Sequence, residues 1–311
     1  NPDNPANNYN YSFCLLISGH IKKGFKFYEN RWNTNSPSFI KRDFKQPLWL
    51  GDQNLSNKTL LVYSEQGFGD MIQTYRYVNE LSKFTSKIIL ETYTPLQTLF
   101  AKNSNNITVI ARGTPLPHFD YHCPMMSLPL IFETTVDKIN SAPYIKASPD
   151  SISKWKKRLP QKTKPFIGIV WTGKDTVKAR SIPLEKFSSL IQENFQYVSL
   201  QKEFTDHDLI YLNNSQNILY FNKELKDFSD TAGLIELMDL VITIDTSVAH
   251  LSAAMGKPTW IPLIKNSDWR WFLNRNDSPW YQSVKLFRQT SKNNWEDVFL
   301  SIKAELSKLP F

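Results

Sequence analysis

The alternation of short apolar runs with helix-like segments is the feature of this sequence that most constrains its fold. Runs rich in β-branched residues predict buried strands, and the amphipathic segments between them predict helices. In the first half of the chain, these are strands at 59–63, 87–91 and 107–110 and helices at 70–81 and 95–103. Repeated strand–helix units form parallel sheets with helices on both faces.

A second series of the same kind begins at residue 166, after a separating stretch at 149–164. Its predicted strands are 166–171, 197–200, 218–221, 240–244, 259–263 and 284–287, and its predicted helices are 183–194 and 231–238. A chain of 311 residues is long enough for two such domains. We therefore predict an α/β fold with two Rossmann-like, doubly wound domains facing a cleft. Ligands of such domains bind outside the carboxyl ends of the strands.

Charge and cysteine content narrow the possible partners. Lysine and arginine number 37 against 29 acidic residues, for a net charge of +8. This charge favours anionic partners such as nucleotides or acidic glycans. The basic residues are scattered and no zinc-finger or RNP signature is present, so we expect no specific nucleic-acid binding. Two distant cysteines, Cys14 and Cys123, and no apolar run long enough for a bilayer indicate a cytoplasmic protein without a transmembrane segment.

The turn that follows the apolar run 240–244 is the clearest candidate for a ligand site. A helical pattern starts here, so its first backbone N–H groups lie beside the hydroxyls of Thr246 and Ser247, an arrangement suited to phosphate oxygens. Asp245 would repel a phosphate, and it either caps the helix or accepts hydrogen bonds from sugar hydroxyls. His250 either contacts the sugar or diphosphate or is a buried structural histidine.

In the first domain, a glycine-containing turn follows the strand predicted at 59–63. Gly67 and Gly69 permit close approach of the backbone, but Ile72 stands where a dinucleotide fingerprint has its third glycine. Asp70, at the start of the next helix, has two interpretations. It either complements the helix dipole or acts as a general base that takes a proton from an acceptor hydroxyl.

In the second domain, Thr172 and Lys174 follow the first predicted strand, and Arg180 precedes the next helix. Lys174 or Arg180 either neutralises charge on a departing diphosphate or is a solvated loop cation. We identify no cluster of histidines and carboxylates at metal-ligand spacing in the sequence. We therefore predict chemistry that needs no metal and no other cofactor.

Two further segments allow more than one interpretation. His122 ends a predicted strand and either meets the acceptor, serves as an alternative base, or is a satisfied turn histidine. The aromatic segment 269–281 either builds core or stacks on a base or sugar while Arg270 and Arg275 hold phosphate.

The first 32 residues predict two helices, at 7–18 and 21–32, joined at Gly19-His20. The pattern is similar to a single tetratricopeptide repeat, and an ordinary helical hairpin is the alternative. One repeat cannot bury its own apolar face, so either earlier repeats have been removed or this pair docks on the next domain.

Together these motifs resemble the bacterial heptosyltransferase superfamily, glycosyltransferase family 9, whose architecture is GT-B. The resemblance rests on Gly67-x-Gly69-Asp70 and on the segment 245–258, and it extends over residues 60–309. It is closer to the tetratricopeptide-repeat-linked bacterial glycosyltransferases. The matching segments are 66–73, 122–129, 180–184, 199–202 and 268–271.

The resemblance implies a role for each matching residue. Asp70 matches the position of the catalytic base, and His122 stays the second catalytic candidate because of its place at a strand end. Arg180 approximately matches a basic residue that contacts donor phosphate, and the donor-binding turn is matched by Asp245, Thr246, Ser247 and His250. We predict that the donor also contacts Thr172, Lys174, Gln201, Lys202 and Arg270, and that the acceptor-side loop comprises Gln66, Gly67, Phe68, Gly69 and Gln73. Ser247 stands where heptosyltransferases usually have glycine, which narrows the donor pocket and puts a heptose donor in question.

The function we predict is a metal-independent, inverting glycosyltransferase that moves a sugar from a nucleotide sugar to a hydroxyl of a protein or surface-glycan acceptor. The expected domains are a repeat-like hairpin at 1–35, open to protein contact, an acceptor-side domain at 36–155, a donor-binding domain at 156–294, and a helix at 295–311 that crosses back to the acceptor side. A nucleotide-sugar epimerase of similar architecture and a non-catalytic, repeat-tethered binding module are the alternatives.

Overall fold

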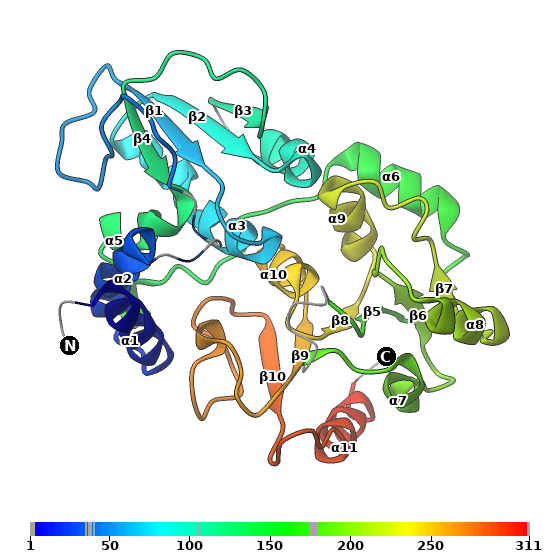
Figure 1. Ribbon diagram of the computed structural model, residues 1–311. Coiled ribbons are helices and arrows are strands. Elements are labelled where there is room, and N and C mark those ends of the chain that lie inside the picture. The colour runs from blue at the N-terminus through cyan, green and yellow to red at the C-terminus, as the bar shows by residue number, and fades with distance from the viewer. Residues whose placement is uncertain are drawn as a thin grey trace. The chain divides into compact units, whose positions relative to one another are not determined.

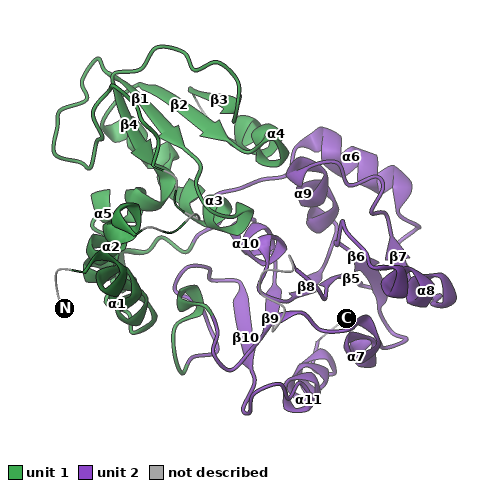
Figure 2. Cartoon of the chain, viewed as in Figure 1, with its two compact units in different colours: residues 1–141, 268–274 green, residues 142–267, 275–311 purple. Residues whose placement is uncertain are grey.

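The computed structural model describes residues 4–309 apart from 35, 37, 38, 40, 105 and 174–179. Within them the chain forms one sheet of four strands and one of six (Figure 1). All neighbouring strands in both sheets run parallel. The prediction of an α/β protein with two parallel sheets is therefore confirmed. The chain divides into two compact units: unit 1 is Asn1–Ser141 with Asp268–Asn274, and unit 2 is Ala142–Ser267 with Arg275–Phe311 (Figure 2).

The sheet of unit 1 has the strand order β3-β2-β1-β4. Its strands are β1 (Thr59–Tyr63), β2 (Lys87–Thr92), β3 (Ile107–Ala111) and β4 (Tyr121–Pro124). Its helices are α3 (Phe68–Thr74), α4 (Thr94–Asn103) and α5 (Leu128–Ile131), with 3₁₀ segments η2 (Tyr75–Tyr77), η3 (Asn79–Lys83), η4 (Met125–Ser127) and η5 (Val136–Lys138). The chain moves outward from β1 to β3 and then returns to the other side of β1, so the strand order reverses between β1 and β4.

The helix predicted at 70–81 is shorter than expected. The α-helix ends at Thr74, and 3₁₀ segments follow it. The Thr74 hydroxyl donates to the carbonyl of Asp70 at 2.8 Å, a back-bond that weakens a helix. Aromatic and β-branched residues follow, and these have low helix propensity.

The N-terminal residues form the expected helical hairpin. It consists of α1 (Pro5–Ile17), α2 (Ile21–Tyr28) and the 3₁₀ segment η1 (Glu29–Asn33). The chain reverses at Gly19, whose φ of 86° lies in the left-handed region that favours glycine. Phe25 of α2 is buried, and its ring meets that of Trp269 edge-on at 5.6 Å. The hairpin thus docks on its own unit, while its assignment as a tetratricopeptide repeat stays a prediction.

The sheet of unit 2 has the order β10-β9-β8-β5-β6-β7. Its strands are β5 (Phe166–Val170), β6 (Gln196–Ser199), β7 (Ile218–Tyr220), β8 (Leu240–Thr243), β9 (Thr259–Leu263) and β10 (Val284–Arg288). Its helices are α6 (Pro149–Arg158), α7 (Leu184–Phe187), α8 (Asp206–Asn214), α9 (Phe228–Glu236), α10 (Ser247–Ala254) and α11 (Glu296–Leu306), with the 3₁₀ segment η7 (Ser188–Leu190). The sequence did not predict α8, because most of its residues are polar.

The boundary between the two units follows Ser141, earlier in the chain than the predicted boundary at 155. Residues 149–158 form α6, which packs on α9 of unit 2: the Trp155 indole donates to the carbonyl of Asp230 at 2.8 Å. Close packing is possible because Gly233 of α9 has no side chain facing Ser151. The stretch that we interpreted as a separator therefore belongs to unit 2.

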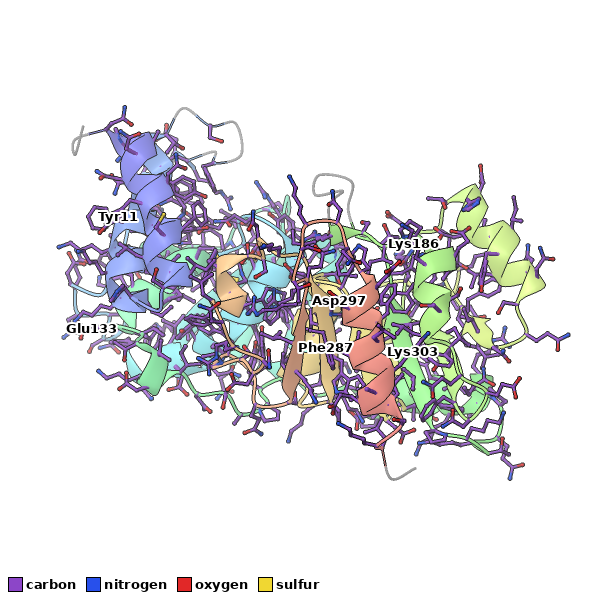
Figure 3. All side chains as sticks on the ribbon, turned by 90° about the horizontal axis from the view of Figure 1, so that it is seen from below. Tyr11, Glu133, Lys186, Phe287, Asp297 and Lys303 are labelled. Carbon is purple, nitrogen blue, oxygen red and sulfur yellow. The ribbon has the colours of Figure 1, made fainter. Side chains whose placement is uncertain are left out.

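The last helix, α11, differs from the expectation that it crosses back to the first domain. Its apolar residues Val298, Ile302 and Leu306 are buried in the same core cluster as Trp171 and Phe287 of unit 2. Figure 3 shows α11, marked by Asp297 and Lys303, beside Phe287 of β10. The helix packs there because its apolar stripe completes the cover of that sheet. No helix in the described part of the chain has the length and hydrophobicity to cross a membrane.

Candidate functional site

The point where the strand order of a parallel sheet reverses is where such a fold binds ligands, at the carboxyl ends of the strands. We call this the switch point. In unit 1 it lies between β1 and β4 and is flanked by the β1 loop (residues 64–67) and by η4. The predicted acceptor-side residues Gln66 and Gly67 lie in the β1 loop, and Phe68 and Gly69 open α3.

Asp70 is the third residue of α3, and both of its carboxylate oxygens are engaged. Oδ2 accepts the Gly67 N–H at 2.7 Å, so the carboxylate lies at the helix start, where it also complements the helix dipole. Oδ1 forms an ion pair with Nη2 of Arg270. The side chain is 21% exposed. Its role as a general base stays a prediction.

Arg270 belongs to Asp268–Asn274, a segment of unit 1, and not to the unit in which we expected it. Its Nε donates to Gln73 at 2.8 Å, its Nη1 donates to Asp268 at 2.7 Å, and its guanidinium lies 4.3 Å from the centre of the Trp269 ring. Burial opposes the charge of Arg270, but Asp268 and Asp70 outweigh it and raise the pKa. Sequence spacing gave no signal for this contact, because Asp70 and Arg270 lie far apart in the chain.

His122 lies on β4 and is 7% exposed. Its ring packs 4.8 Å from that of Phe44 and 5.7 Å from that of Tyr63. Burial, with a smaller contribution from the charge of Arg42, lowers the pKa of His122 to about 4. At neutral pH the imidazole is therefore uncharged and only weakly basic. This placement favours a structural role over that of an alternative base.

In unit 2 the strand order reverses between β5 and β8, the two central strands. The β5 loop (residues 171–173) and the turn before α10 flank this switch point. The N-cap of α10 is Thr246, not Asp245, and the Thr246 side chain makes no capping hydrogen bond. Ser247 is the first helical residue. The helix therefore begins at the switch point, as the sequence predicted.

Three of the predicted donor-binding segments converge here. A Cβ atom placed on Gly173 would lie 3.2 Å from Cγ2 of Thr246 and 3.4 Å from Nε of Arg180. That nitrogen is buried and has no hydrogen-bond partner among the residues that the structure describes. The Thr172 hydroxyl bonds to Ser181 at 3.1 Å, a contact that the sequence did not predict. Lys174 lies outside the described residues.

Gln201 and Lys202 are used to hold loops. The Gln201 side chain is buried; its Oε1 accepts the N–H of Thr172 at 3.1 Å, and its Nε2 donates to the carbonyl of Glu203 at 2.7 Å. Lys202 donates to the carbonyl of Lys226 at 2.8 Å. Gln201 therefore holds the β5 loop in place, because both polar atoms of its amide are bonded to backbone groups.

His250 and the aromatic segment are mostly buried. Nδ1 of His250 lies 2.9 Å from the hydroxyl of Tyr281, and the histidine is 4% exposed. The aromatic residues of the segment 269–281 are all buried, which confirms the interpretation that they build core. They are Trp269, Trp271, Phe272, Trp280 and Tyr281.

No group of three or more His, Cys, Asp or Glu side chains in the described part of the chain is arranged to hold a metal ion. The structure thus offers no metal centre of that kind for the described residues. That the chemistry needs no metal stays a prediction.

Comparison with known proteins supports the fold. No protein-family model and no curated protein matches the chain. Among solved structures, it is similar to a glycosyltransferase family 9 protein from Veillonella parvula DSM 2008, with a TM-score of 0.56, 13% identity and coverage of 83% of this chain and 91% of that one. It is also similar to the E. coli ADP-heptose LPS heptosyltransferase II, with a TM-score of 0.55, 12% identity and coverage of 80% and 99%.

A third similar structure is the E. coli heptosyltransferase WaaC with ADP-2-deoxy-2-fluoro heptose, with a TM-score of 0.56, 10% identity and coverage of 80% and 99%. At these identities the similarity shows the fold alone. The chain has the fold of family 9 heptosyltransferases. Its two parallel sheets correspond to two Rossmann-like domains of the GT-B type.

Proposed function

We propose that this protein is a glycosyltransferase that moves a sugar from a nucleotide-sugar donor to a hydroxyl of an acceptor. The observation that carries the proposal is the convergence of Gly173, Arg180 and Thr246 at the switch point of unit 2. A guanidinium beside the start of a helix offers charge-assisted donors to a diphosphate. The fold similarity to heptosyltransferases supports the same conclusion, and WaaC was solved with an ADP-sugar analogue.

In this proposal the donor binds to unit 2. Arg180 and the first N–H groups of α10 hold the diphosphate, with the hydroxyls of Thr172 and Thr246 beside them. Asp245, just before the N-cap of α10, and His250, within α10, contact the sugar. Lys174, four residues after β5 ends, adds a second positive charge.

The acceptor binds to unit 1, where Asp70 takes the proton from its hydroxyl. The acceptor oxygen then forms a bond to the anomeric carbon as the bond from that carbon to the diphosphate breaks. The nucleoside diphosphate leaves with the electron pair, and the configuration of the sugar inverts. Each Asp70 oxygen accepts one hydrogen bond already, which leaves a second lone pair for the acceptor.

Two features of the proposal go beyond the fold. Arg180 and Lys174 neutralise the leaving diphosphate, so that no metal is needed. Transfer also brings the acceptor hydroxyl to the anomeric carbon of the donor, as the resemblance to GT-B enzymes implies. The acceptor is a hydroxyl of a protein or a surface glycan.

The test is a thermal-shift screen of the full chain against ADP-, UDP-, GDP- and CDP-sugars. A donor that binds only the folded state at 100 times its Kd stabilises that state by about 2.7 kcal/mol. Mass spectrometry then identifies the product formed from the best ligand, with added glycans and peptides as acceptors. A new glycosidic bond is the expected result.

Two other results contradict the proposal. Conversion of the donor to an epimer, with no acceptor needed, indicates a nucleotide-sugar epimerase. If no nucleotide sugar raises the melting temperature and none is consumed, the chain is a binding module on the same architecture.

A further inference from the structure

The N-terminal hairpin holds the β1 loop through a buried arginine. Arg31 of η1 is fully buried, and its Nε and Nη2 donate to the two carboxylate oxygens of Glu65 at 2.9 and 2.8 Å. Nη2 also donates to the Ser127 hydroxyl at 2.9 Å. Glu65 follows β1 and Ser127 ends η4, so one guanidinium joins the β1 loop and η4, the two segments that flank the switch point of unit 1.

The same hairpin holds the next residue in an unusual backbone conformation. Gln66 has a φ of 63°, in the left-handed region that residues other than glycine rarely adopt. Its side-chain amide is bonded to the Tyr28 hydroxyl of α2 at 2.6 Å, and its carbonyl accepts from the Tyr93 hydroxyl at 2.8 Å. Strained residues of this kind persist only where their surroundings hold them, and they cluster at functional sites.

Asp70 depends on this conformation through a single peptide group. The Gly67 N–H that bonds to Oδ2 of Asp70 belongs to the peptide between Gln66 and Gly67. A change in the backbone of Gln66 therefore turns that N–H away from the carboxylate. A continuous set of contacts runs from Arg31 and Tyr28 through Glu65 and Gln66 to the carboxylate of Asp70.

The charges around Arg31 indicate that its pair with Glu65 fixes the orientation of the β1 loop. Glu29 also accepts from Nη1 of Arg31 at 2.6 Å, so one buried cation faces two carboxylates. Burial raises the pKa of Glu65, and the charge of Arg31 opposes that rise. Buried ion pairs are poor sources of net stability compared with apolar packing, whereas a bidentate pair imposes a defined orientation.

We propose that the hairpin is a built-in support for the β1 loop, and that Arg31 and Tyr28 are positioning residues for the sugar transfer. For its catalytic consequence this inference rests on the proposed function of Asp70. The side chains of Arg31 and Tyr28 are occupied within the chain, so a protein partner of the hairpin would have to bind elsewhere on its surface.

The test compares Tyr28→Phe and Arg31→Met in the full chain with two matched controls. Tyr11→Phe removes a hydroxyl from an exposed tyrosine of α1, and Arg158→Met removes an arginine from the exposed ion pair with Glu224. Hydrogen exchange is followed for the peptide 64–71. Transfer is followed as release of nucleoside diphosphate from the ADP-sugar or other nucleotide sugar that gives the largest thermal shift, with water as acceptor.

We expect Tyr28→Phe to speed exchange in this peptide by about tenfold and to lower kcat by about 10- to 100-fold, because small misplacements of catalytic groups have effects of this size. The donor KM stays within twofold. Arg31→Met has the larger effect, and Arg31→Lys does not restore activity because an ammonium cannot bind Glu65 in the bidentate mode. The controls behave as wild type in both measurements.

Unchanged exchange in folded Tyr28→Phe and Arg31→Met overturns the inference. So does faster exchange without a fall in kcat, since the loop would then move with no effect on transfer. An Asp70→Asn variant that keeps full activity identifies a failure of the proposed function instead. Tyr28→Phe keeps the test decisive if Arg31→Met does not fold.

Discussion

The loops at the two switch points use their polar side chains differently. In unit 1, Arg31 is bonded to Glu65 and Ser127, and Arg270 is paired with Asp70. In unit 2, Nε of Arg180 is buried without a partner among the residues described, beside the bare backbone of Gly173. A buried polar group that the protein leaves unpaired is costly unless a ligand bonds to it. The comparison agrees with our proposal that unit 2 receives the donor, whereas the contacts in unit 1 hold the side chain of Asp70 in position.

The largest expected effect is that of replacing Asp70, the side chain that unit 1 holds in position. We expect Asp70→Asn to lower the transfer kcat by about 10²- to 10⁴-fold, the usual contribution of a general base. Donor affinity, which we assign to unit 2, stays within twofold in isothermal titration. Equal kcat values for Asp70→Asn and wild type would refute the base assignment.

Removal of the arginine that faces Asp70 is the next largest effect. We expect Arg270→Met to lower the free energy of unfolding by about 3 kcal/mol, the low end for a broken buried ion pair because Asp268 is partly exposed. The control is Arg275→Met, which breaks a more exposed pair with Asp277 and costs about 0–1 kcal/mol. Chemical denaturation measures both. Equal losses would show that the Asp70 contact is no stronger than a surface pair.

Arg180 tests the opposite prediction for unit 2. We expect Arg180→Ala to weaken donor binding by about 10- to 100-fold, because hydrogen bonds to charged groups contribute about 1.5–3 kcal/mol. The unfolding free energy stays close to that of wild type, since the guanidinium loses no bond from Nε within the described residues. Lys156→Ala, which removes an exposed lysine of α6, is the control. A large loss of stability with unchanged binding would make Arg180 a structural residue like Arg31.

A pair of glycine substitutions sharpens the same distinction within unit 2. The added Cβ of Gly173→Ala meets Thr246 and Arg180 in the proposed donor site. We expect about tenfold weaker donor binding, a value within the usual effect of overpacking. In Gly233→Ala the Cβ would lie 2.7 Å from the backbone carbon of Ser151, which costs stability and leaves donor affinity unchanged in what remains folded. Thermal unfolding and titration separate the two, and the reverse assignment would contradict the site.

His122 provides the smallest effect and concerns the framework of unit 1. Its pKa is about 4 in the folded chain, below the ordinary value of about 6.5. The unfolded chain therefore binds more protons between these values, so the histidine favours folding fully above pH 6.5 and loses this contribution as the pH falls toward 4. Subtracting the stability of His122→Gln from that of wild type should give a difference that grows with pH over this window. A difference that does not change with pH would show that the pKa of His122 is the same in the folded and the unfolded chain.

The sequence determined the framework of this protein. The apolar runs 59–63 and 259–263 became β1 and β9 with the predicted bounds, because buried parallel strands are continuous apolar segments. It also placed Asp70 and Ser247 at helix starts after strands, since strand, turn and helix are neighbours in the chain. Helix ends were less predictable: the helix expected at 183–194 stops at Phe187, and η7 continues only to Leu190.

The tertiary structure decided which residues meet. Asp70 with Arg270, Glu65 with Arg31, and Gly173 with Thr246 are each separated by many positions, and only the order of strands and the docking of the hairpin bring them together. The same applies to α11. Its apolar stripe does not specify which sheet it covers, and only the packed core shows that the helix belongs to unit 2. Local propensity depends on neighbours in the chain, whereas the partner of a charged or apolar side chain depends on contacts across the fold.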